Sequence, residues 1–417
     1  MTKRIGAGLA LAKVGILAAG LVSCSKGGQA EKHLQAALRL QEQGRWEEAV
    51  VELDSAVRLD PLKAQGFYYR GIAWDYLGGF EQAIRDFDEA IRLDPEMAGA
   101  YHNRGYAYKS LGNYPGALQD FGEAIRLRPD YAEAYDERGL ANAALGQFDQ
   151  ALADHTEAIR LRPDDPVPYH NRGRAFHSMG RFVEAIADFS EAIRRNPQFD
   201  LAFSSRAASL QLGGDPAGAR RDFDTALELN PGLIQALLGR GALLDSQGDH
   251  KKAILDYDEA IRRNPDYAQA YNNRGRAYWN LGSTSQAIAD FDAAIRLDPQ
   301  MVPAYNNRGV LYDSLGRYDQ AIQDFDASLR LSPQAPMVYG RRGAAYHNLG
   351  RREQALEDLN RSIQLDPKYG EAYAVRSLVH TALGRIRDAQ RDRDQAVRLG
   401  IDPVFFERKT AVGRRMR

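Results

Sequence analysis

The feature that most constrains this chain is a pair of registers, one of proline and one of glycine, that both repeat every 34 residues. The prolines are Pro61, Pro95, Pro129, Pro163, Pro197, Pro231, Pro265, Pro299, Pro333 and Pro367. The glycines are Gly44, Gly78, Gly112, Gly146, Gly180, Gly214, Gly248, Gly282, Gly316, Gly350 and Gly384. No insertion shifts either register, so the chain divides into eleven units of equal spacing that begin at Ala30.

The segment Tyr267–Met301 shows what one unit predicts. Two stretches of about a dozen residues each place apolar or small residues at the spacing of one helix face. They carry Tyr271, Gly275, Tyr278 and Leu281, and then Ala287, Ile288, Phe291, Ala294 and Ile295. Gly282 predicts the end of the first helix and Pro299 the end of the second. The unit is therefore expected to be a helical hairpin, which needs neighbouring hairpins to bury its apolar faces.

A helix–turn–helix unit with this period resembles the tetratricopeptide-repeat (TPR) family, over roughly nine tenths of the chain. The resemblance implies an all-α, right-handed α-solenoid of eleven repeats with one continuous core. The expected repeats are 30–63, 64–97, 98–131, 132–165, 166–199, 200–233, 234–267, 268–301, 302–335, 336–369 and 370–401. In this family the position of Arg274 usually holds Leu, so the chain represents a sub-type.

The first 29 residues lie outside the repeats. Basic residues precede an apolar run, Val14–Val22, which is too short to span a bilayer as a helix. Leu21-Val22-Ser23-Cys24 resembles a bacterial lipobox, and Cys24 is the only cysteine. We therefore expect a signal peptide at 1–23, a lipidated Cys24 and a flexible linker over 24–29. The alternatives are an uncleaved anchor or an accidental apolar start.

Both ends of the array depart from the repeat. Repeat 1 has Ala36-Ala37 where most of the others have Arg-Gly, and repeat 11 has Arg393 at a position that is Phe291 in repeat 8. Such departures are expected of capping units, which have a neighbour on one side only. The basic tail 402–417 is expected to be disordered, or else to contact a partner or the envelope.

Two charged positions also recur, an Arg on the first helix and an Asp on the second. Arg274 and Asp290 are the pair in repeat 8. Arg forms good partly buried pairs with carboxylates, so a ladder that ties the stack together is expected. Because repeat 1 lacks the Arg, each one is expected to reach back to the preceding unit, for example Arg70 to Glu52. The alternative is a basic stripe that binds a ligand.

Residues that vary between repeats on the first helices are the candidates for partner binding. They are His102, Asn103, Tyr106, His170, Asn171, Arg174, His177, Asn272, Asn273, Arg276, Trp279, Asn306 and Asn307. In TPR families this face lines a concave groove for extended peptides. The recurring Asn resemble the asparagine ladder of O-GlcNAc transferase, whose amides hold a peptide backbone. The alternatives are that Asn is a solvated surface residue and that Trp279 packs on its own hairpin.

The sequence contains none of the common catalytic motifs. His170 and His177 are about 10 Å apart along a helix, too far to share one metal ion. We therefore expect no enzyme activity, no metal and no cofactor. The formal net charge of -1 gives no bulk attraction to nucleic acid. The expected function is a membrane-anchored scaffold of the cell envelope, facing the periplasm (on the outer membrane in a Gram-negative host) or the cell surface. The alternatives are a cytosolic co-chaperone-like adaptor and a sensor of a glycan or small ligand.

Overall fold

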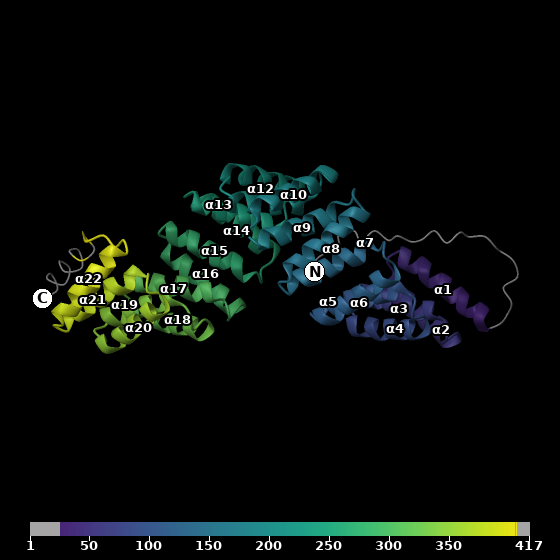
Figure 1. The fold of residues 1–417 in the computed structure, drawn as a ribbon, viewed down its shortest axis with the longest axis horizontal. Coiled ribbons are helices and arrows are strands. Elements are labelled where there is room, and N and C mark those ends of the chain that lie inside the picture. Colours follow the sequence, from purple (N-terminus) through teal and green to yellow (C-terminus); the bar gives the residue numbers. More distant parts are fainter. Residues whose placement is uncertain (1–25, 405, 407–417) are drawn as a thin grey trace. The chain divides into compact units, whose positions relative to one another are not determined.

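The computed structural model describes residues 26–404 and 406, and in that part of the chain the structure contains only helices. The helices belong to two units, and the boundary in the chain falls between Arg195 and Asn196. The signal peptide predicted at 1–23 and Cys24 lie outside the described residues, as does most of the tail. The expected all-α stack of helical hairpins is confirmed (Figure 1).

The first unit holds ten helices of the described part. They are α1 (Lys26–Glu42), α2 (Trp46–Leu59), α3 (Ala64–Tyr76), α4 (Phe80–Leu93), α5 (Ala98–Ser110), α6 (Tyr114–Leu127), α7 (Ala132–Ala144), α8 (Phe148–Leu161), α9 (Pro166–Ser178) and α10 (Phe182–Arg195). The helix α1 begins four residues before the predicted repeat boundary. Residues 26–29, which were expected to be a flexible linker, are therefore helical.

The second unit holds the remaining twelve helices of the described part. They are α11 (Asp200–Leu212), α12 (Pro216–Leu229), α13 (Ile234–Ser246), α14 (His250–Arg263), α15 (Ala268–Asn280), α16 (Thr284–Leu297), α17 (Val302–Ser314), α18 (Tyr318–Leu331), α19 (Pro336–Asn348), α20 (Arg352–Leu365), α21 (Gly370–Ala382) and α22 (Ile386–Arg398). At the end of α22, Phe406 is buried against Ala374 and Ala396, so the start of the tail packs on the last hairpin.

The turn within each hairpin depends on the periodic glycine. Gly282 has φ 77°, a left-handed conformation that glycine adopts without strain. Its N–H donates to the carbonyl of Trp279 at 2.9 Å, and the next N–H, of Ser283, donates to the carbonyl of Tyr278 at 2.8 Å. These bonds satisfy the last carbonyls of α15 and reverse the chain into α16. The periodic glycine therefore fixes the length of every first helix.

The second recurring glycine allows the two helices of a hairpin to approach closely. A Cβ on Gly275 would lie 2.9 Å from the ring of Phe291 and 3.2 Å from the carbonyl oxygen of Ala287. Phe291 is fully buried. The predicted close approach is therefore present, and the aromatic side chain of the second helix occupies the space that glycine leaves. Enlarging the glycine would overpack the hairpin core.

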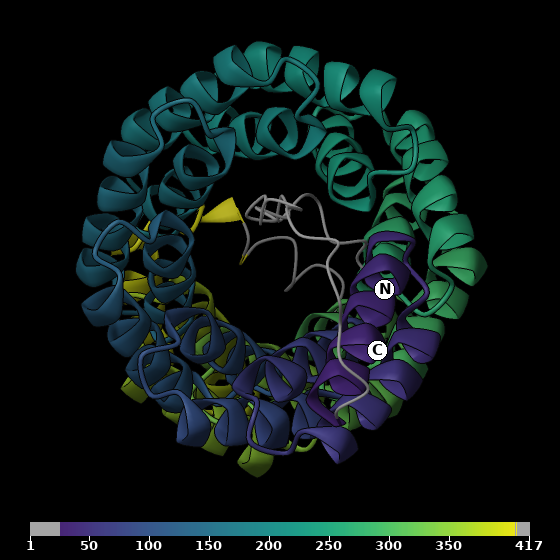
Figure 2. The ribbon, with the colours of Figure 1, turned by 90° about the vertical axis from the view of Figure 1, so that its right-hand side faces the viewer.

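First helices of consecutive hairpins pack on one another within each unit. Such contacts join α1 to α3, α3 to α5, α5 to α7 and α7 to α9 in the first unit. In the second unit they run from α11 through α13, α15, α17 and α19 to α21. The structure shows no comparable packing between consecutive second helices of the described hairpins. The first helices therefore form the tighter, inner layer of each unit, and the two layers are visible in Figure 2.

The recurring Arg and Asp form the expected ladder. Arg274 donates to both carboxylate oxygens of Asp290, at 2.8 and 2.7 Å, and its remaining nitrogen donates to Asp258 at 2.5 Å. The hydrogen bond with Asp290 holds the pKa of Arg274 above its ordinary value. Because the Asp290 side chain is only 8% exposed, this bidentate pair is shielded from water. Each Arg thus joins its own hairpin and clamps the preceding one.

The ladder is nearly continuous. The pairs within a hairpin are Arg70–Asp86, Arg104–Asp120, Arg138–Asp154, Arg172–Asp188, Arg206–Asp222, Arg240–Asp256, Arg274–Asp290, Arg308–Asp324, Arg342–Asp358 and Arg376–Asp392. The bonds back to the preceding hairpin include Arg70–Asp54, Arg104–Asp88, Arg172–Thr156, Arg240–Asp224, Arg274–Asp258, Arg308–Asp292, Arg342–Asp326 and Arg376–Asn360.

The predicted partner of Arg70 is wrong in detail. Arg70 does reach back to the preceding hairpin, but it contacts Asp54 there, and Glu52 instead accepts a hydrogen bond from His33 at 2.7 Å. Asp54 and Asp86 lie 16 residues before and after Arg70, so the guanidinium sits midway between two second helices. This geometry makes the arginine position structural and leaves no row of free guanidinium groups for a ligand.

Candidate functional site

All thirteen candidate residues lie on first helices, in the inner layer of their own unit. His102, Asn103 and Tyr106 are on α5, and His170, Asn171, Arg174 and His177 are on α9. Asn272, Asn273, Arg276 and Trp279 are on α15, and Asn306 and Asn307 are on α17. The last six lie on two neighbouring first helices of the second unit.

Three of the candidate asparagines bond to the preceding first helix. Asn103 donates to the hydroxyl of Tyr68 at 3.3 Å, and Asn171 donates to Asp136 at 2.8 Å. Asn307 donates to the side-chain oxygen of Asn272 at 2.9 Å. Each bond joins residues 35 apart in the sequence, so the same geometry recurs along the stack. These amide N–H groups hold neighbouring hairpins together.

Asn273 differs from these three. The residue 35 positions before it is Leu238, which offers no polar side chain. Its side-chain oxygen accepts a hydrogen bond from Asn272 at 3.3 Å. Asn307, Asn272 and Asn273 therefore form a short chain of amides that ends at the partly exposed Asn273. Nearby, the side-chain oxygen of Asn306 is buried without a hydrogen-bond partner in the described structure.

Arg276 is already engaged with a carboxylate. It donates to Asp245 of α13 at 3.0 Å, and its side chain is 42% exposed. Asp245 is buried and also accepts hydrogen bonds from Asn280 at 3.3 Å and His250 at 2.6 Å. A partner carboxylate would therefore have to share Arg276 with Asp245.

Trp279 is partly buried against a cluster that its own hairpin and the next one share. It packs on a cluster of Ala287, Phe291 and Leu311, together with Tyr278 and Ile288. One side of the indole thus contributes to the core, and the exposed remainder is what a partner could contact. An alanine at this position would disturb both roles.

In the first unit, α9 carries the most exposed candidate. Arg174 is exposed, whereas His170 is buried against the ring of Phe189, with centroids 5.5 Å apart. Burial lowers the pKa of His170 from its ordinary 6.5 to about 4. The rings of His177 and Phe182 pack edge to face with centroids 5.5 Å apart, and burial lowers the pKa of His177 as well. Only Arg174 and part of His177 are open to a partner.

On α5, His102 packs between two rings, with centroids 5.8 Å from Phe121 and 4.8 Å from Tyr131. Burial lowers the pKa of His102 below its ordinary value. Tyr106 lies beneath the ammonium group of Lys109, at 4.7 Å from the ring centroid. This helix therefore presents neutral and cationic groups together.

Two buried aspartates that the sequence analysis did not single out organise this face. Asp136 accepts from Asn171 and from the buried His155 at 2.7 Å, and Asp245 receives Arg276. Asp136 precedes Asn171 by 35 residues, and Asp245 precedes Arg276 by 31 residues. An alignment of neighbouring first helices would have brought these pairs side by side. In the described part of the chain, no group of three His, Cys, Asp or Glu could hold a metal ion. None of the helices searched there is long and apolar enough to cross a membrane.

Comparison with protein families gives consistent matches. Models described as "Tetratricopeptide repeat" match residues 206–268, 238–302 and 272–336, and also 166–199 and 336–369. A model described as "TPR repeat" matches residues 76–112, 105–146 and 139–180. Together these matches span well over half of the chain. A search of curated proteins finds no match.

One solved structure reaches a TM-score of 0.50 and shows the same fold, and others are similar over part of this chain. The APC/C hetero-tetramer Cut9-Hcn1 has a TM-score of 0.50 and 15% identity, with 89% of this chain and 94% of that chain covered. A tetratricopeptide repeat protein from Parabacteroides merdae has a TM-score of 0.49 and 19% identity, covering 59% and 97%. A thermophilic TPR protein of Thermus thermophilus has a TM-score of 0.38 and 25% identity, covering 44% and 99%.

Proposed function

The chain belongs to the tetratricopeptide-repeat family, whose members generally mediate protein–protein interactions, and from that premise we propose a membrane-tethered scaffold that binds a partner protein. The partner contributes an extended segment that lies along the first helices. The observation that carries this proposal is that structural positions are constant between repeats whereas accessible positions vary. Arg, Asp, Gly and Pro recur and build the stack, whereas the inner-layer positions of α5, α9, α15 and α17 vary.

The residues for direct contact are those that the fold leaves accessible. Asn273, Arg276 and the open side of Trp279 are adjacent on α15, and Arg174 is exposed on α9. Asn273 ends the amide chain, so it can hydrogen-bond a peptide unit of the partner. Trp279 offers aromatic contact area, which is frequent in binding hot spots.

Substitution on α15 tests this assignment. Asn273→Ala combined with Arg276→Ala should weaken binding of an identified partner at least about tenfold, or about 1.4 kcal/mol. Arg296→Ala is the matched control, because Arg296 is exposed on the second helix of the same hairpin. Unchanged affinity in the double variant, with unchanged helicity, would contradict a contact on α15.

The tether is the acylated Cys24 that the lipobox-like Leu21-Val22-Ser23-Cys24 suggests. Ser25 follows it rather than Asp, which by resemblance to Gram-negative lipoproteins favours the outer membrane. The protein should incorporate labelled palmitate and fractionate with membranes, and Cys24→Ala should abolish the label and release the protein. A wild-type protein that is unlabelled and soluble would favour an adaptor without a membrane anchor.

A further inference from the structure

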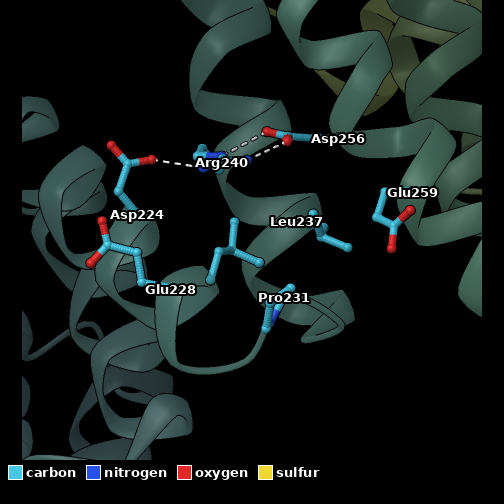
Figure 3. A pocket seen from close by; sticks show the side chains of 8 residues that line it. Asp224, Glu228, Pro231, Leu237, Arg240, Asp256 and Glu259 are labelled. Carbon is cyan, nitrogen blue, oxygen red and sulfur yellow. Dashed lines mark hydrogen bonds and ion pairs between the residues drawn. The ribbon is translucent and has the colours of Figure 1, made fainter.

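The second unit contains an open cavity of about 510 Å³ between α12, α13 and α14. It is lined by Asp224, Leu227, Glu228, Pro231, Leu237, Arg240, Asp256 and Glu259 (Figure 3). The cavity shares no residue with the candidate positions on the first helices. Its lining combines the apolar residues Leu227, Pro231 and Leu237 with charged residues.

The cavity coincides with a departure from the repeat at Leu237. At the same position every other hairpin from repeat 2 onward has an aromatic residue. These residues are Phe67, Tyr101, Tyr135, Tyr169, Phe203, Tyr271, Tyr305, Tyr339 and Tyr373. In the next hairpin, the Tyr271 ring centroid lies 5.5 Å from the guanidinium carbon of Arg274. Leu237 and Arg240, the counterparts of Tyr271 and Arg274, both line the cavity.

The tyrosines at this position also indicate which backbone carbonyl a hydroxyl group in the cavity could reach. The hydroxyl of Tyr169 donates to the carbonyl of Pro163 at 3.3 Å, and that of Tyr305 donates to the carbonyl of Pro299 at 3.4 Å. Pro231 precedes Leu237 by the same six residues and lines the cavity. A phenol in the cavity could therefore reach the carbonyl of Pro231 as the native tyrosines reach theirs.

The rim of the cavity departs from the repeat as well. Glu228 stands where the other repeats have Arg58, Arg92, Arg126, Arg160, Arg194, Arg262, Arg296, Arg330, Gln364 and Arg398. Glu228 is exposed and has no ion-pair partner in the described structure, whereas Asp224 and Asp256 are held by Arg240. Glu259 is shared between Arg262 and Arg263. Glu228 is therefore the one lining carboxylate available to a cation.

We propose that this cavity binds an aromatic side chain carried by a basic segment of the partner protein. The ring lies between Leu227, Leu237 and Pro231 beside the guanidinium group of Arg240, in the place that Tyr271 occupies next to Arg274. A Lys or Arg next to the aromatic residue pairs with Glu228. The proposal rests on the scaffold function and adds a second contact of defined chemistry.

The first test uses three short peptides with the full chain. The probe is N-acetyl-Lys-Tyr-Lys-amide, compared with the same peptide containing Leu for Tyr and with one containing Glu for both Lys. Binding is followed by the methyl NMR signals of Leu227 and Leu237. The tyrosine–lysine peptide should bind at least tenfold more tightly than either control. Equal affinities, or no shift of those methyl signals, would overturn the proposal.

The second test restores the repeat pattern. Leu237→Tyr supplies the missing ring and should lower the peptide affinity at least tenfold while the melting temperature stays equal or rises. Glu228→Arg should weaken binding and remove its dependence on salt. Peptide affinity that survives both substitutions would overturn the proposal, as would a lower melting temperature for Leu237→Tyr. Neither result bears on the scaffold function, because partner binding through α15 is measured separately with Asn273→Ala and Arg276→Ala.

Discussion

Gly122 leaves one position of the Arg–Asp ladder without a back contact, and replacing it with Asp should supply one. Arg138 bonds to Asp154 of its own hairpin at 3.0 and 2.6 Å. Arg104 bonds to Asp88, 16 residues before it, at 2.6 Å. The residue 16 positions before Arg138 is Gly122, which has no side chain. A Cβ built on Gly122 meets no atom within 4 Å, so the site has room for a carboxylate.

The expected gain separates into backbone and charge contributions. Replacing a glycine inside a helix with Ala gains about 1 kcal/mol, and Asp or Asn retains roughly a third to a half of that gain. An exposed ion pair with Arg138 adds about 0.5–1 kcal/mol at low salt. Gly122→Asp should therefore be about 0.8–1.5 kcal/mol more stable than wild type, and about 0.5–1 kcal/mol more stable than Gly122→Asn.

Urea unfolding followed by circular dichroism measures these differences in low salt and in about 1 M NaCl, where screening is strong. The Asp and Asn variants have similar helix propensity, so their difference isolates the charge contribution, which high salt should largely remove. Gly122→Ala reports the backbone gain alone. Equal stability of the Asp and Asn variants at low salt would refute the clamping role of the back contact.

Two further predictions concern the hairpin core and a buried histidine. Gly275→Ala should destabilise the protein by up to about 2 kcal/mol in urea unfolding, because the new Cβ presses on Phe291 by more than the helix gains. Asn307→Gly should offset part of this loss, because the chain's own Ala207, the counterpart of position 275, coexists with Gly239, the counterpart of position 307, which lies close to Phe223. Since Asn307→Gly also removes the bond to Asn272, the double variant should lose less stability than the two single variants added together, and an additive loss would contradict this. In the folded protein His170 stays neutral down to about pH 4, whereas in the unfolded chain it takes a proton below about pH 6.5. The free energy of unfolding should therefore decrease as the pH is lowered from about 6.5 to 4. His170→Asn should therefore remove a loss of about 2 kcal/mol between about pH 7.5 and 5, and an unchanged pH profile of urea unfolding would contradict the burial of a neutral imidazole.

The hairpin boundaries could be predicted because single residues determine them. Gly282 ends α15 through its left-handed backbone conformation, and Pro299 follows the end of α16. These two residues are therefore enough to predict where both helices end. The contacts between hairpins could not be predicted to the same accuracy. The distinction between Asp54 and Glu52 as the partner of Arg70 depends on how far one hairpin is offset from the next.

The candidate positions show the same limit. The sequence placed the Asn residues on the first helices, but it did not show that Asn103, Asn171 and Asn307 bond to the preceding helix. That pairing appears only when adjacent helices are aligned with an offset of 35 residues. The departure at Leu237 was readable from the sequence, because every other hairpin from repeat 2 onward has an aromatic residue there. Its consequence, a cavity beside Arg240, required the packing of three helices.

The path of the partner along the first helices can be mapped by site-specific photo-crosslinking. p-Benzoylphenylalanine is placed in the full chain at Asn273 or Arg174, on the inner layer, and at Arg296 or Arg92, which are exposed on second helices. Crosslinks to one partner protein are expected from Asn273 and Arg174, with little or none from Arg296 and Arg92. Equal crosslinking from all four positions, or crosslinks from the second helices alone, would contradict this path.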